Sequence, residues 1–524
     1  MTSVSSDKNT WVVIKFGGTS VSTLNNWENI AAIVREHLNQ YEHVLIVCSA
    51  PSKVSNLLDA LVTEAIQNKY ESTFKTILKI YENLTQDLSC SFDLLQPMFE
   101  ELEQWVKGIA LLGEASPKMR AKIMAFGELS LTKLGVAYLK KQHINLVWQD
   151  VRQLLVADPR QAEKFPEHHP ARFLAVDCET DFDPAVLNLL NELPAPVVMT
   201  QGFIASNAQG ETVLLGRGGS DLAATYLAAK INAAACEIWT DVAGVYTANP
   251  HQVPQAQILK TLHYDEAQEI ASMGAKVLHP KCIEPVRKHH IPLWVKCTSS
   301  PNLPGTHIFN TSDLSNLPIK SVIVKDNTLL ISIETVEMWW QVGFLARVFS
   351  CFKKYGLSID LISTSGANVT VSLDPSSDGQ NPEILEKLLL ELNTFTKTRS
   401  IGPCATISLV GHHIRSVLHL LGSVFNLFAQ QQVYLLSQAA NDLNLSLVVD
   451  SDQAPRLLQE IHQLLIEPAI VNESKIDYAS IRSLDYWNSD AWWIKDEKKL
   501  LELMDESCEP HYVYSKACLT NTVN

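Results

Sequence analysis

Residues 215–231, LGRGGSDLAATYLAAKI, join a run of glycine and charged residues to an alanine-rich helix pattern. Paired glycines let backbone N–H groups approach a bound anion closely, and a helix start adds partial positive charge. Arg217 can form two parallel hydrogen bonds with a carboxylate or phosphate, and Asp221 can accept from an ammonium group. The stretch therefore fits a zwitterionic amino acid. The alternative is a simple glycine turn in which Ser220 or Asp221 caps the helix.

A second glycine pair follows the first apolar run of the chain, in the motif KFGGTS (15–20). Lys15 can meet a phosphate group as a point charge, and Gly17 and Gly18 can supply backbone donors. The motif is not a Walker A loop, because the GxxxxGK[ST] pattern is absent. Two further motifs, WTDVAGVY (239–246) and GAKVLHP (274–280), place an aspartate after a strand and a lysine near a helix end.

Around these motifs, short apolar runs alternate with longer helical patterns between residues 11 and 306. The expected strands cover 11–16, 43–50, 144–150, 196–203, 237–246 and 291–297. One expected helix begins at Ser116-Pro117, a cap followed by a first-turn proline, and runs through Glu128 toward Lys141. The alternation predicts an α/β fold with a mostly parallel sheet, whose ligands bind beyond the carboxyl ends of the strands.

The pattern changes after residues 301–318, a stretch rich in Pro, Asn and Ser that we expect to be a linker. Residues 345–374 then align without a gap on residues 421–450. The identical pairs are Leu345/Leu421, Val348/Val424, Phe349/Phe425, Phe352/Phe428, Asn368/Asn444 and Asp374/Asp450. Each copy reads as strand, amphipathic helix, strand, strand and helix, which indicates a tandem repeat of a small αβ module. The repeat carries no catalytic constellation, so we expect it to be regulatory or structural.

Composition excludes several classes of function. A chain of 524 residues is long enough for more than one domain. Its formal charge of -15, from 42 basic and 57 acidic residues, argues against a nucleic-acid binder. No signal peptide and no run of 18 apolar residues is present, so we expect no membrane partner and a cytoplasmic location. Ten cysteines without CxxC pairs indicate reduced thiols, and the three His-His pairs lack further ligands for a metal.

Taken in order, KFGGTS, FGE (126–128), GRGGSD, WTDVAGVY and GAKVLHP resemble the motifs of aspartate kinases in the amino-acid kinase superfamily. The resemblance covers roughly residues 11–465, and the repeats resemble ACT domains, which bind feedback effectors in this family. It implies an amino-acid kinase fold over 10–308, two ferredoxin-like α+β ACT domains over 319–397 and 402–468, and an extension over 469–524.

The resemblance also implies a role for each matched residue. Lys15 would neutralise charge on the transferring phosphoryl group, with Gly17 and Gly18 as backbone donors beside it. The aspartate-handling positions would be Ser49, Ser55, Glu128, Arg217, Ser220 and Asp221. The nucleotide-binding positions would be Thr240, Asp241, Tyr246, His251, Lys276 and Val277, together with Lys15 and Gly18.

An enzyme of this family transfers the γ-phosphoryl group of ATP to the β-carboxylate of L-aspartate. The product, 4-phospho-L-aspartate, enters lysine, threonine and methionine biosynthesis. The acceptor carboxylate is already ionised at neutral pH, so catalysis is positioning plus electrostatics, with Mg²⁺ bridging phosphate oxygens. The alternatives are a non-catalytic amino-acid sensor with ACT domains and a related kinase with another acceptor.

The sequence departs from the family pattern at several positions. Asn249 and His251, in TANPH, replace the Asp and Arg of the family's TxDPR, which alters one expected nucleotide contact. Pro51 stands where the family has a small flexible residue, and Gly366 replaces a usual glutamate in the first repeat.

The first repeat resembles a lysine-binding ACT site. The matching positions are Met338, Phe344, Leu345, Ser358, Ile359 and Asp360. Asp360 would pair with the effector ammonium, which favours L-lysine over L-threonine, unless it is a plain strand-end residue. ACT modules usually pair edge to edge, so a homodimer is expected.

Residues after about Glu467 belong to neither module. The stretch 485–519, with a Trp pair, an amphipathic helix pattern and HYVYS, resembles the opening of a diaminopimelate decarboxylase. Some bacteria fuse that enzyme to aspartate kinase, and no barrel follows here. We expect the kinase half of such a fusion, and the alternative is an unrelated extension.

Overall fold

The computed structural model describes residues 11–162, 165, 169–275, 277–310, 319–335, 342–373, 381–415, 421–428 and 432–466. The chain divides into one unit that ends at Ile466 and a second unit that begins at Glu467. The second unit, with its expected likeness to a decarboxylase, lies outside the described residues.

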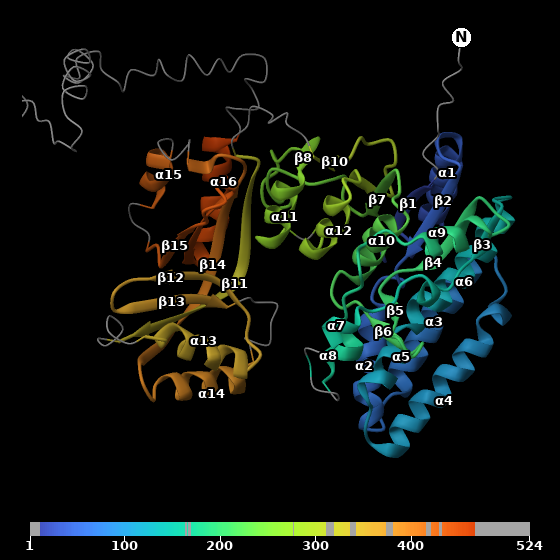
Figure 1. Ribbon diagram of the computed structural model, residues 1–524, viewed down its shortest axis with the longest axis horizontal. Coiled ribbons are helices and arrows are strands. Elements are labelled where there is room, and N and C mark those ends of the chain that lie inside the picture. The colour runs from blue at the N-terminus through green and yellow to red at the C-terminus, as the bar shows by residue number, and fades with distance from the viewer. Residues whose placement is uncertain are drawn as a thin grey trace, which may run out of the picture. The chain divides into compact units, whose positions relative to one another are not determined.

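Eight strands form the sheet of the first part of the chain, in the order β3-β4-β2-β1-β7-β9-β10-β8 (Figure 1). They are β1 (Trp11–Phe16), β2 (His43–Cys48), β3 (Leu146–Trp148), β4 (Val197–Gln201), β7 (Ala235–Thr240), β8 (Thr261–His263), β9 (Leu293–Cys297) and β10 (Thr306–Phe309). Neighbours in this sheet pair in parallel except β9 and β10. The prediction of a mostly parallel sheet is confirmed.

The prediction that residues 301–318 are a linker is wrong for the segment that forms β10. Thr306 and Ile308 point inward and are fully buried, while the alternate residues His307 and Phe309 are half-buried. This alternation is the period of a strand, and the Pro and Asn residues before it hid that period. Residues 311–318 lie outside the described residues.

Successive side chains of a strand point to opposite faces of the sheet. Both sets are buried and largely apolar in β1, so helices cover both faces. On one face, Val12 and Ile14 of β1 pack with α1 and α6. On the other, Val13 packs with α10 and α12. The longer helices are α1 (Leu24–Gln40), α2 (Val54–Ile66), α3 (Glu71–Asp87), α4 (Gln96–Leu112), α5 (Pro117–Met124), α6 (Phe126–Lys141), α9 (Pro184–Asn191), α10 (Gly219–Lys230) and α11 (Tyr264–Ser272). Shorter elements are α7 (Pro159–Ala162), α8 (Ala171–Leu174), α12 (Ile283–Lys288) and the hairpin β5 (Ile204–Ser206) with β6 (Thr212–Leu214).

The helix expected from Ser116 toward Lys141 forms as two helices, α5 and α6, that meet at Ala125. Ser116 caps α5 as predicted, with its Oγ accepting from the N–H of Met119 at 3.2 Å. At the start of α6, a Cβ on Gly127 would lie 2.7 Å from the Cβ of Ala50. Glycine therefore lets α6 approach the loop after β2, and Glu128 follows directly.

The second sheet has six strands in the order β12-β13-β11-β14-β16-β15. Its strands are β11 (Ser321–Glu334), β12 (Ile359–Thr364), β13 (Asn368–Leu373), β14 (Lys397–Val410), β15 (Leu435–Gln438) and β16 (Asn444–Asp450). Its helices are α13 (Phe344–Lys354), α14 (Pro382–Leu392), α15 (Leu421–Leu427) and α16 (Ala454–Leu465). The predicted repeat is confirmed, since each copy gives helix, strand, strand and helix in the same order. The strand order is symmetrical about the central pair β11 and β14, with the hairpin of the first copy on one side and that of the second copy on the other.

Strand β11 serves both halves of this sheet. Its first residues, 321–325, pair with the last residues of β14. Its later residues, 329–334, pair with β13 on one side and the start of β14 on the other. Strand β11 therefore joins the strands of both repeats into one continuous sheet.

The start of β11 also touches the turn after β7. Ser321 Oγ donates to the carbonyl of Tyr246 at 3.1 Å, and the N–H of Val322 donates to the carbonyl of Thr247 at 2.8 Å. The Thr247 hydroxyl lies 2.9 Å from Nε2 of His462 in α16. These buried contacts tie the second sheet to the turn that carries the expected nucleotide positions.

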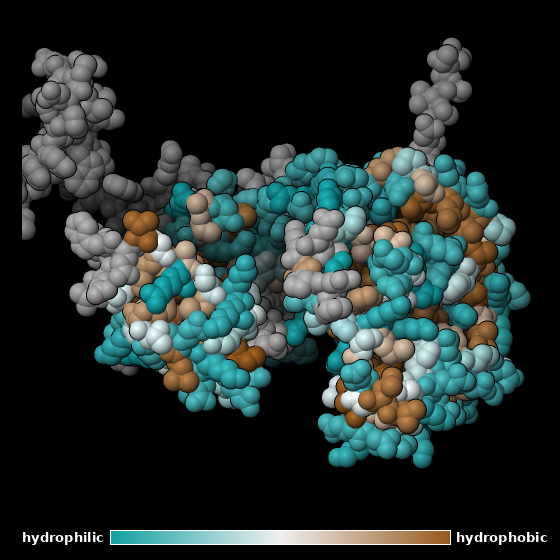
Figure 2. Space-filling model, turned by 60° about the horizontal axis from the view of Figure 1, so that its bottom comes forward, coloured by the Kyte–Doolittle hydropathy of each residue, from teal (hydrophilic) through white to brown (hydrophobic). Residues whose placement is uncertain are grey.

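Hydrophilic side chains cover most of the face drawn in Figure 2, with apolar residues in smaller groups among them. Among the described helices, none is both long enough and apolar enough to cross a membrane. The cysteines in the described part of the chain are all free thiols.

A buried charge cluster joins β7 to α1 and β9. Glu237 lies 3.1 Å from Nε2 of His37 and 2.8 Å from Nζ of Lys296, and it also accepts from the indole of Trp239. The other ring nitrogen of His37 faces the carbonyl of Ile33 at 2.8 Å. Both ring nitrogens face acceptors, so the doubly protonated imidazolium satisfies this geometry. Burial opposes that charge, but the hydrogen bond and charge of Glu237 outweigh it and raise the pKa of His37.

This cluster predicts a pH-dependent stability. The folded pKa of His37 exceeds the unfolded value, so its contribution is full below about pH 6.5 and is lost as pH rises through the folded pKa. Replacing His37 by Gln should lower the free energy of unfolding more at pH 6 than at pH 9, because the raised pKa of His37 stabilises the fold only where the imidazole is protonated. Urea unfolding of both proteins at the two pH values measures this. An equal difference at both values would contradict the assignment.

Candidate active site

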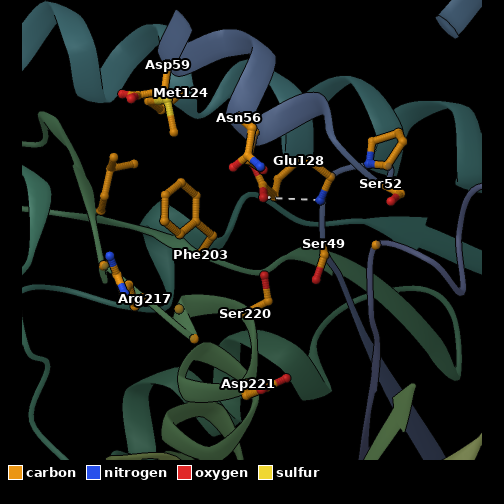
Figure 3. A pocket seen from close by; sticks show the side chains of 18 of the residues that line it. Ser49, Ser52, Asn56, Asp59, Met124, Glu128, Phe203, Arg217, Ser220 and Asp221 are labelled. Atoms are coloured by element: carbon orange, nitrogen blue, oxygen red, sulfur yellow. Dashed lines mark hydrogen bonds between the residues drawn. The ribbon is translucent and has the colours of Figure 1, made fainter. Parts of the chain in front are cut away.

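A cavity of about 570 Å³ opens at the carboxyl ends of β1 and β2. Figure 3 shows Asn56 and Asp59 of α2 on one side of it, and Ser220 and Asp221 at the start of α10 on the other. Its lining residues include Lys15, Gly18, Ser49, Ser52, Lys53, Ser55, Asn56, Asp59, Arg120, Met124, Glu128, Phe203, Arg217, Gly218, Ser220 and Asp221. The pocket lies where ligands of a parallel sheet usually bind.

Lys15 is the basic group at the floor of this cavity. It is the last residue but one of β1, it is 7% exposed, and its Nζ lies 2.5 Å from Oδ1 of Asp221. The ammonium group of a lysine is a compact positive charge. A phosphoryl group carries more negative charge than a carboxylate, so it can replace Asp221 as the partner of Lys15. The pair therefore holds two opposite charges side by side at the wall of the cavity.

Two glycines of the pocket have no room for a side chain. A Cβ on Gly18 would lie 2.9 Å from the carbonyl oxygen of Ala50. A Cβ on Gly218 would lie 2.3 Å from the Cβ of His279, and Gly218 has a φ of 66°, which glycine adopts without strain. Both motifs thus need glycine for close packing as well as for access to a ligand.

The prediction that Ser220 or Asp221 caps the following helix is wrong. The helix α10 already begins at Gly219, and Gly218 is its N-cap, with no side-chain capping bond. The left-handed turn at Gly218 starts the helix earlier than the capping pattern suggested. Ser220 and Asp221 therefore lie in the first turn, and their side chains line the cavity.

Glu128 is the buried acid of the pocket, with 2% exposure. Its Oε1 accepts from the N–H of Ala50 at 3.1 Å, and its Oε2 has no hydrogen-bond partner among the described residues. Burial raises the pKa of Glu128 to about 8. A buried carboxyl group with one open oxygen at a cavity wall is suited to receive an ammonium group, which would restore its charge.

Two arginines line the cavity and differ in their partners. Arg120 pairs with Asp59 at 2.7 Å and also donates to Thr63. Arg217 is exposed, and it makes no ion pair with the residues that the structure describes. Arg217 is therefore the one whose planar fork is available to a carboxylate from solution.

The structure brings most of the predicted substrate and phosphate positions into this one cavity. Lys15, Gly18, Ser49, Ser55, Glu128, Arg217, Ser220 and Asp221 all line it. Gly17 lies beside it, where its N–H donates to the carbonyl of Trp239 at 3.0 Å. The predicted nucleotide positions Thr240, Asp241, Tyr246, His251 and Val277 are not among its lining residues, and Lys276 is outside the described residues.

The unusual TANPH segment keeps an ordered turn. Oδ1 of Asn249 accepts from the N–H of His251 at 3.0 Å, and the carbonyl of Asn249 accepts from Gln252 and Val253. An aspartate at this position would form the same turn through its side-chain oxygen. The substitution thus preserves the backbone path and changes only the charge there.

Sequence reasoning missed one wall of the pocket. Asn56 and Asp59 come from α2, Arg120 and Met124 come from α5, and Phe203 follows β4. Asp59 lies four residues after Ser55, so helical spacing places both on the same face of α2. That spacing can be read from the sequence, but no sequence pattern shows that α2 lies next to Arg120 in space.

The predicted effector positions lie at the start of α13 and of β12. Phe344 is buried, Leu345 and Ser358 are exposed, and Ile359 and Asp360 are half-buried. Met338 is outside the described residues. Within the described ranges, no group of three or more His, Cys, Asp or Glu side chains could hold a metal ion.

Comparison with known proteins gives consistent matches. Residues 10–297 match the amino acid kinase family. The chain is 31% identical over 470 residues to lysine-sensitive aspartokinase 3 of Escherichia coli, a match that covers 87% of this chain and 99% of that protein. It is 30% identical over 493 residues to chloroplastic aspartokinase 1 of Arabidopsis thaliana, which covers 90% and 84%.

Two solved structures of one relative are also similar. Aspartokinase III of E. coli in complex with aspartate and ADP, in its R-state, matches with a TM-score of 0.74 and 29% identity over 87% of this chain and all of that one (100%). The complex of aspartokinase III with lysine and aspartate, in its T-state, matches with a TM-score of 0.68 and 28% identity over 87% and 99%.

Proposed function

Because the chain belongs to the amino acid kinase family, and within it to the aspartokinases, we propose that it transfers the γ-phosphoryl group of ATP to the β-carboxylate of L-aspartate. The observation that carries this proposal is one cavity that combines three groups. These are a buried lysine behind a glycine turn, an arginine without an ion-pair partner among the described residues, and a glutamate with one open oxygen. Together they can hold a zwitterion and a phosphoryl group at the same time.

The amino acid is held at both of its charged ends. Arg217 receives the α-carboxylate through two parallel hydrogen bonds. Glu128 receives the ammonium, because Asp221, the other acid considered for that role, is engaged by Lys15. Ser49, Ser55 and Ser220 are available to the remaining oxygens. This leaves the β-carboxylate directed toward Lys15.

The transfer needs no general base, since the attacking carboxylate is ionised at neutral pH. Lys15 neutralises charge on the transferring group, and the N–H group of Gly18 lies on the adjacent turn. The N–H group of Gly17 is not available for this role, because it donates to the carbonyl of Trp239. Mg²⁺ in such sites is held by one or two carboxylates together with substrate phosphates. Asp221, which the incoming phosphoryl group would release from Lys15, fits as that carboxylate. When bound, Mg²⁺ would neutralise charge on the phosphate oxygens.

Formation of aspartyl hydroxamate tests the proposal directly. The full chain is incubated with ATP, L-aspartate, Mg²⁺ and hydroxylamine, with and without L-lysine or L-threonine. We expect hydroxamate that depends on both ATP and aspartate. ATP binding without hydroxamate would favour the amino-acid sensor, and product with a different acceptor would favour the related kinase.

The raised pKa of Glu128 predicts how aspartate binding depends on pH. The empty site holds a neutral carboxyl group below about pH 8, so binding an ammonium there releases a proton. At saturating ATP, the KM for aspartate should fall up to about tenfold per pH unit as pH rises toward 8, and should level off above it.

ADP formation measured across this pH range gives the KM values. In the control variant Glu128→Gln, which cannot titrate, the bend near pH 8 should disappear while the KM stays high. A flat profile in the unchanged protein would contradict the role of Glu128.

We also propose that residues 319–397 and 402–468 are ACT domains, that L-lysine binds at Asp360, and that the chain forms a homodimer through these domains. Support comes from the repeated αβ topology and from a relative that is named lysine-sensitive. A cytoplasmic location, and the likeness of residues 469–524 to a decarboxylase opening, remain predictions from the sequence.

A further inference from the structure

Asp360, the expected partner of the effector ammonium, is already paired with a lysine of the chain itself. Nζ of Lys325 donates to Oδ2 of Asp360 at 2.8 Å. Both side chains are mostly buried, at 16% and 23% exposure. Lys325 thus places against Asp360 the same ammonium group, on the same flexible stem, that a free lysine molecule would place there.

The stem of Lys325 lies on a glycine of the first part of the chain. A Cβ built on Gly274 would lie 3.3 Å from the Cβ and 3.4 Å from the Cγ of Lys325. Gly274 opens the GAKVLHP segment, which also carries His279, the side chain packed against Gly218. Lys325 thus lies between the effector carboxylate and a segment that reaches the substrate pocket.

The position of Lys325 on β11 gives a second link to the same region. Four residues earlier, Ser321 donates to the carbonyl of Tyr246, and Val322 donates to that of Thr247. The first part of β11 therefore touches both segments that hold expected nucleotide positions. Lys325 therefore contacts one of these segments itself, at Gly274, and lies on the strand that is hydrogen-bonded to the other.

We propose that Lys325 is an internal competitor of the effector, which occupies Asp360 in the empty site and must be displaced by the ammonium of bound L-lysine. The inference rests on the proposed effector role of Asp360 and adds how that site is regulated. Displacement releases the ammonium of Lys325 from Asp360 while the aliphatic stem still lies on Gly274. The site is available only in the fraction of molecules in which the pair of Lys325 and Asp360 is open, so the pair weakens the apparent affinity for L-lysine. A ligand must also bring a positive charge of its own to replace that of Lys325 at Asp360.

Isothermal titration of the full chain with L-lysine tests this, independently of enzymatic activity. Lys325→Met keeps the stem over Gly274 and removes the charge, so the Kd for L-lysine should fall by about threefold to tenfold. Lys325→Arg keeps the pair and should show no such tightening. The midpoint of inhibition by L-lysine should shift in parallel with the Kd.

Controls separate this inference from the proposal beneath it. Lys354 pairs with Glu391 in the same repeat, at 2.7 Å, and Lys354→Met should leave the Kd within about twofold. L-norleucine, which lacks the ammonium group at the end of the side chain, should gain nothing from Lys325→Met. If Asp360→Asn weakens L-lysine binding but Lys325→Met does not tighten it, the competitor role is overturned. If Asp360→Asn leaves binding intact, the effector site itself is misplaced and the inference fails with it.

Discussion

Replacing Lys15 by methionine should lower kcat by about a hundredfold to a thousandfold at saturating ATP and aspartate. Lys15 is the buried cation at the end of β1, and in a site of low dielectric its charge stabilises the transferring phosphoryl group far more than it would in water. Remote contacts to the nucleotide and to aspartate remain, so the KM values should change much less. ADP formation by the purified variant measures both constants.

The loss of Lys15 also leaves the partly buried Asp221 without its cation, and breaking such a pair costs up to about 3–5 kcal/mol. A matched control separates stability from catalysis. Lys230, at the other end of α10, is buried to a similar degree and pairs with Asp183 at 3.3 Å, away from this cavity. Lys230→Met should lower stability but keep kcat within about threefold. Equal losses of kcat in the two variants would show that Lys15 acts only through folding.

Replacing Arg217 by alanine should raise the KM for aspartate by about tenfold to a hundredfold, with a smaller change in kcat. A bidentate bond between guanidinium and carboxylate contributes about 1.5–3 kcal/mol, and it forms in both the ground state and the transition state. Arg217→Lys should recover only part of this, since a point charge lacks the planar fork. Initial rates over a range of aspartate concentrations give the KM.

Arg120 is the matched control, because it lines the same cavity but is already paired with Asp59. Arg120→Ala should therefore raise the KM for aspartate much less than Arg217→Ala does. The opposite ranking would assign the substrate carboxylate to Arg120 and would displace the proposed binding pose.

Features that depend on local pattern were predictable. The β-branched run of β1 and the other apolar runs predicted buried parallel strands, because such strands are covered on both faces. The gapless match of residues 345–374 with 421–450 predicted the repeated module. Errors arose where a strand is short, as at β10, or where one backbone angle decides the helix start, as at Gly218.

The candidate site was predictable by residue type but not by pairing. The glycine turns and Arg217 stood out in the sequence, and the family resemblance implied Glu128, whereas neither pointed to Asp59, Arg120 or Phe203. The raised pKa of Glu128 could not be predicted either, because it follows from burial by segments far apart in the chain.

The sequence alone determined the α/β class, the tandem repeat and the two glycine motifs, since hydrophobic period and glycine spacing are properties of neighbouring residues. Only the tertiary structure decided which charges meet. It pairs Lys15 with Asp221 and Lys325 with Asp360, and it leaves Arg217 without an ion-pair partner among the described residues. Coulomb interactions and desolvation depend on distance through space and on burial, and neither is encoded by position along the chain.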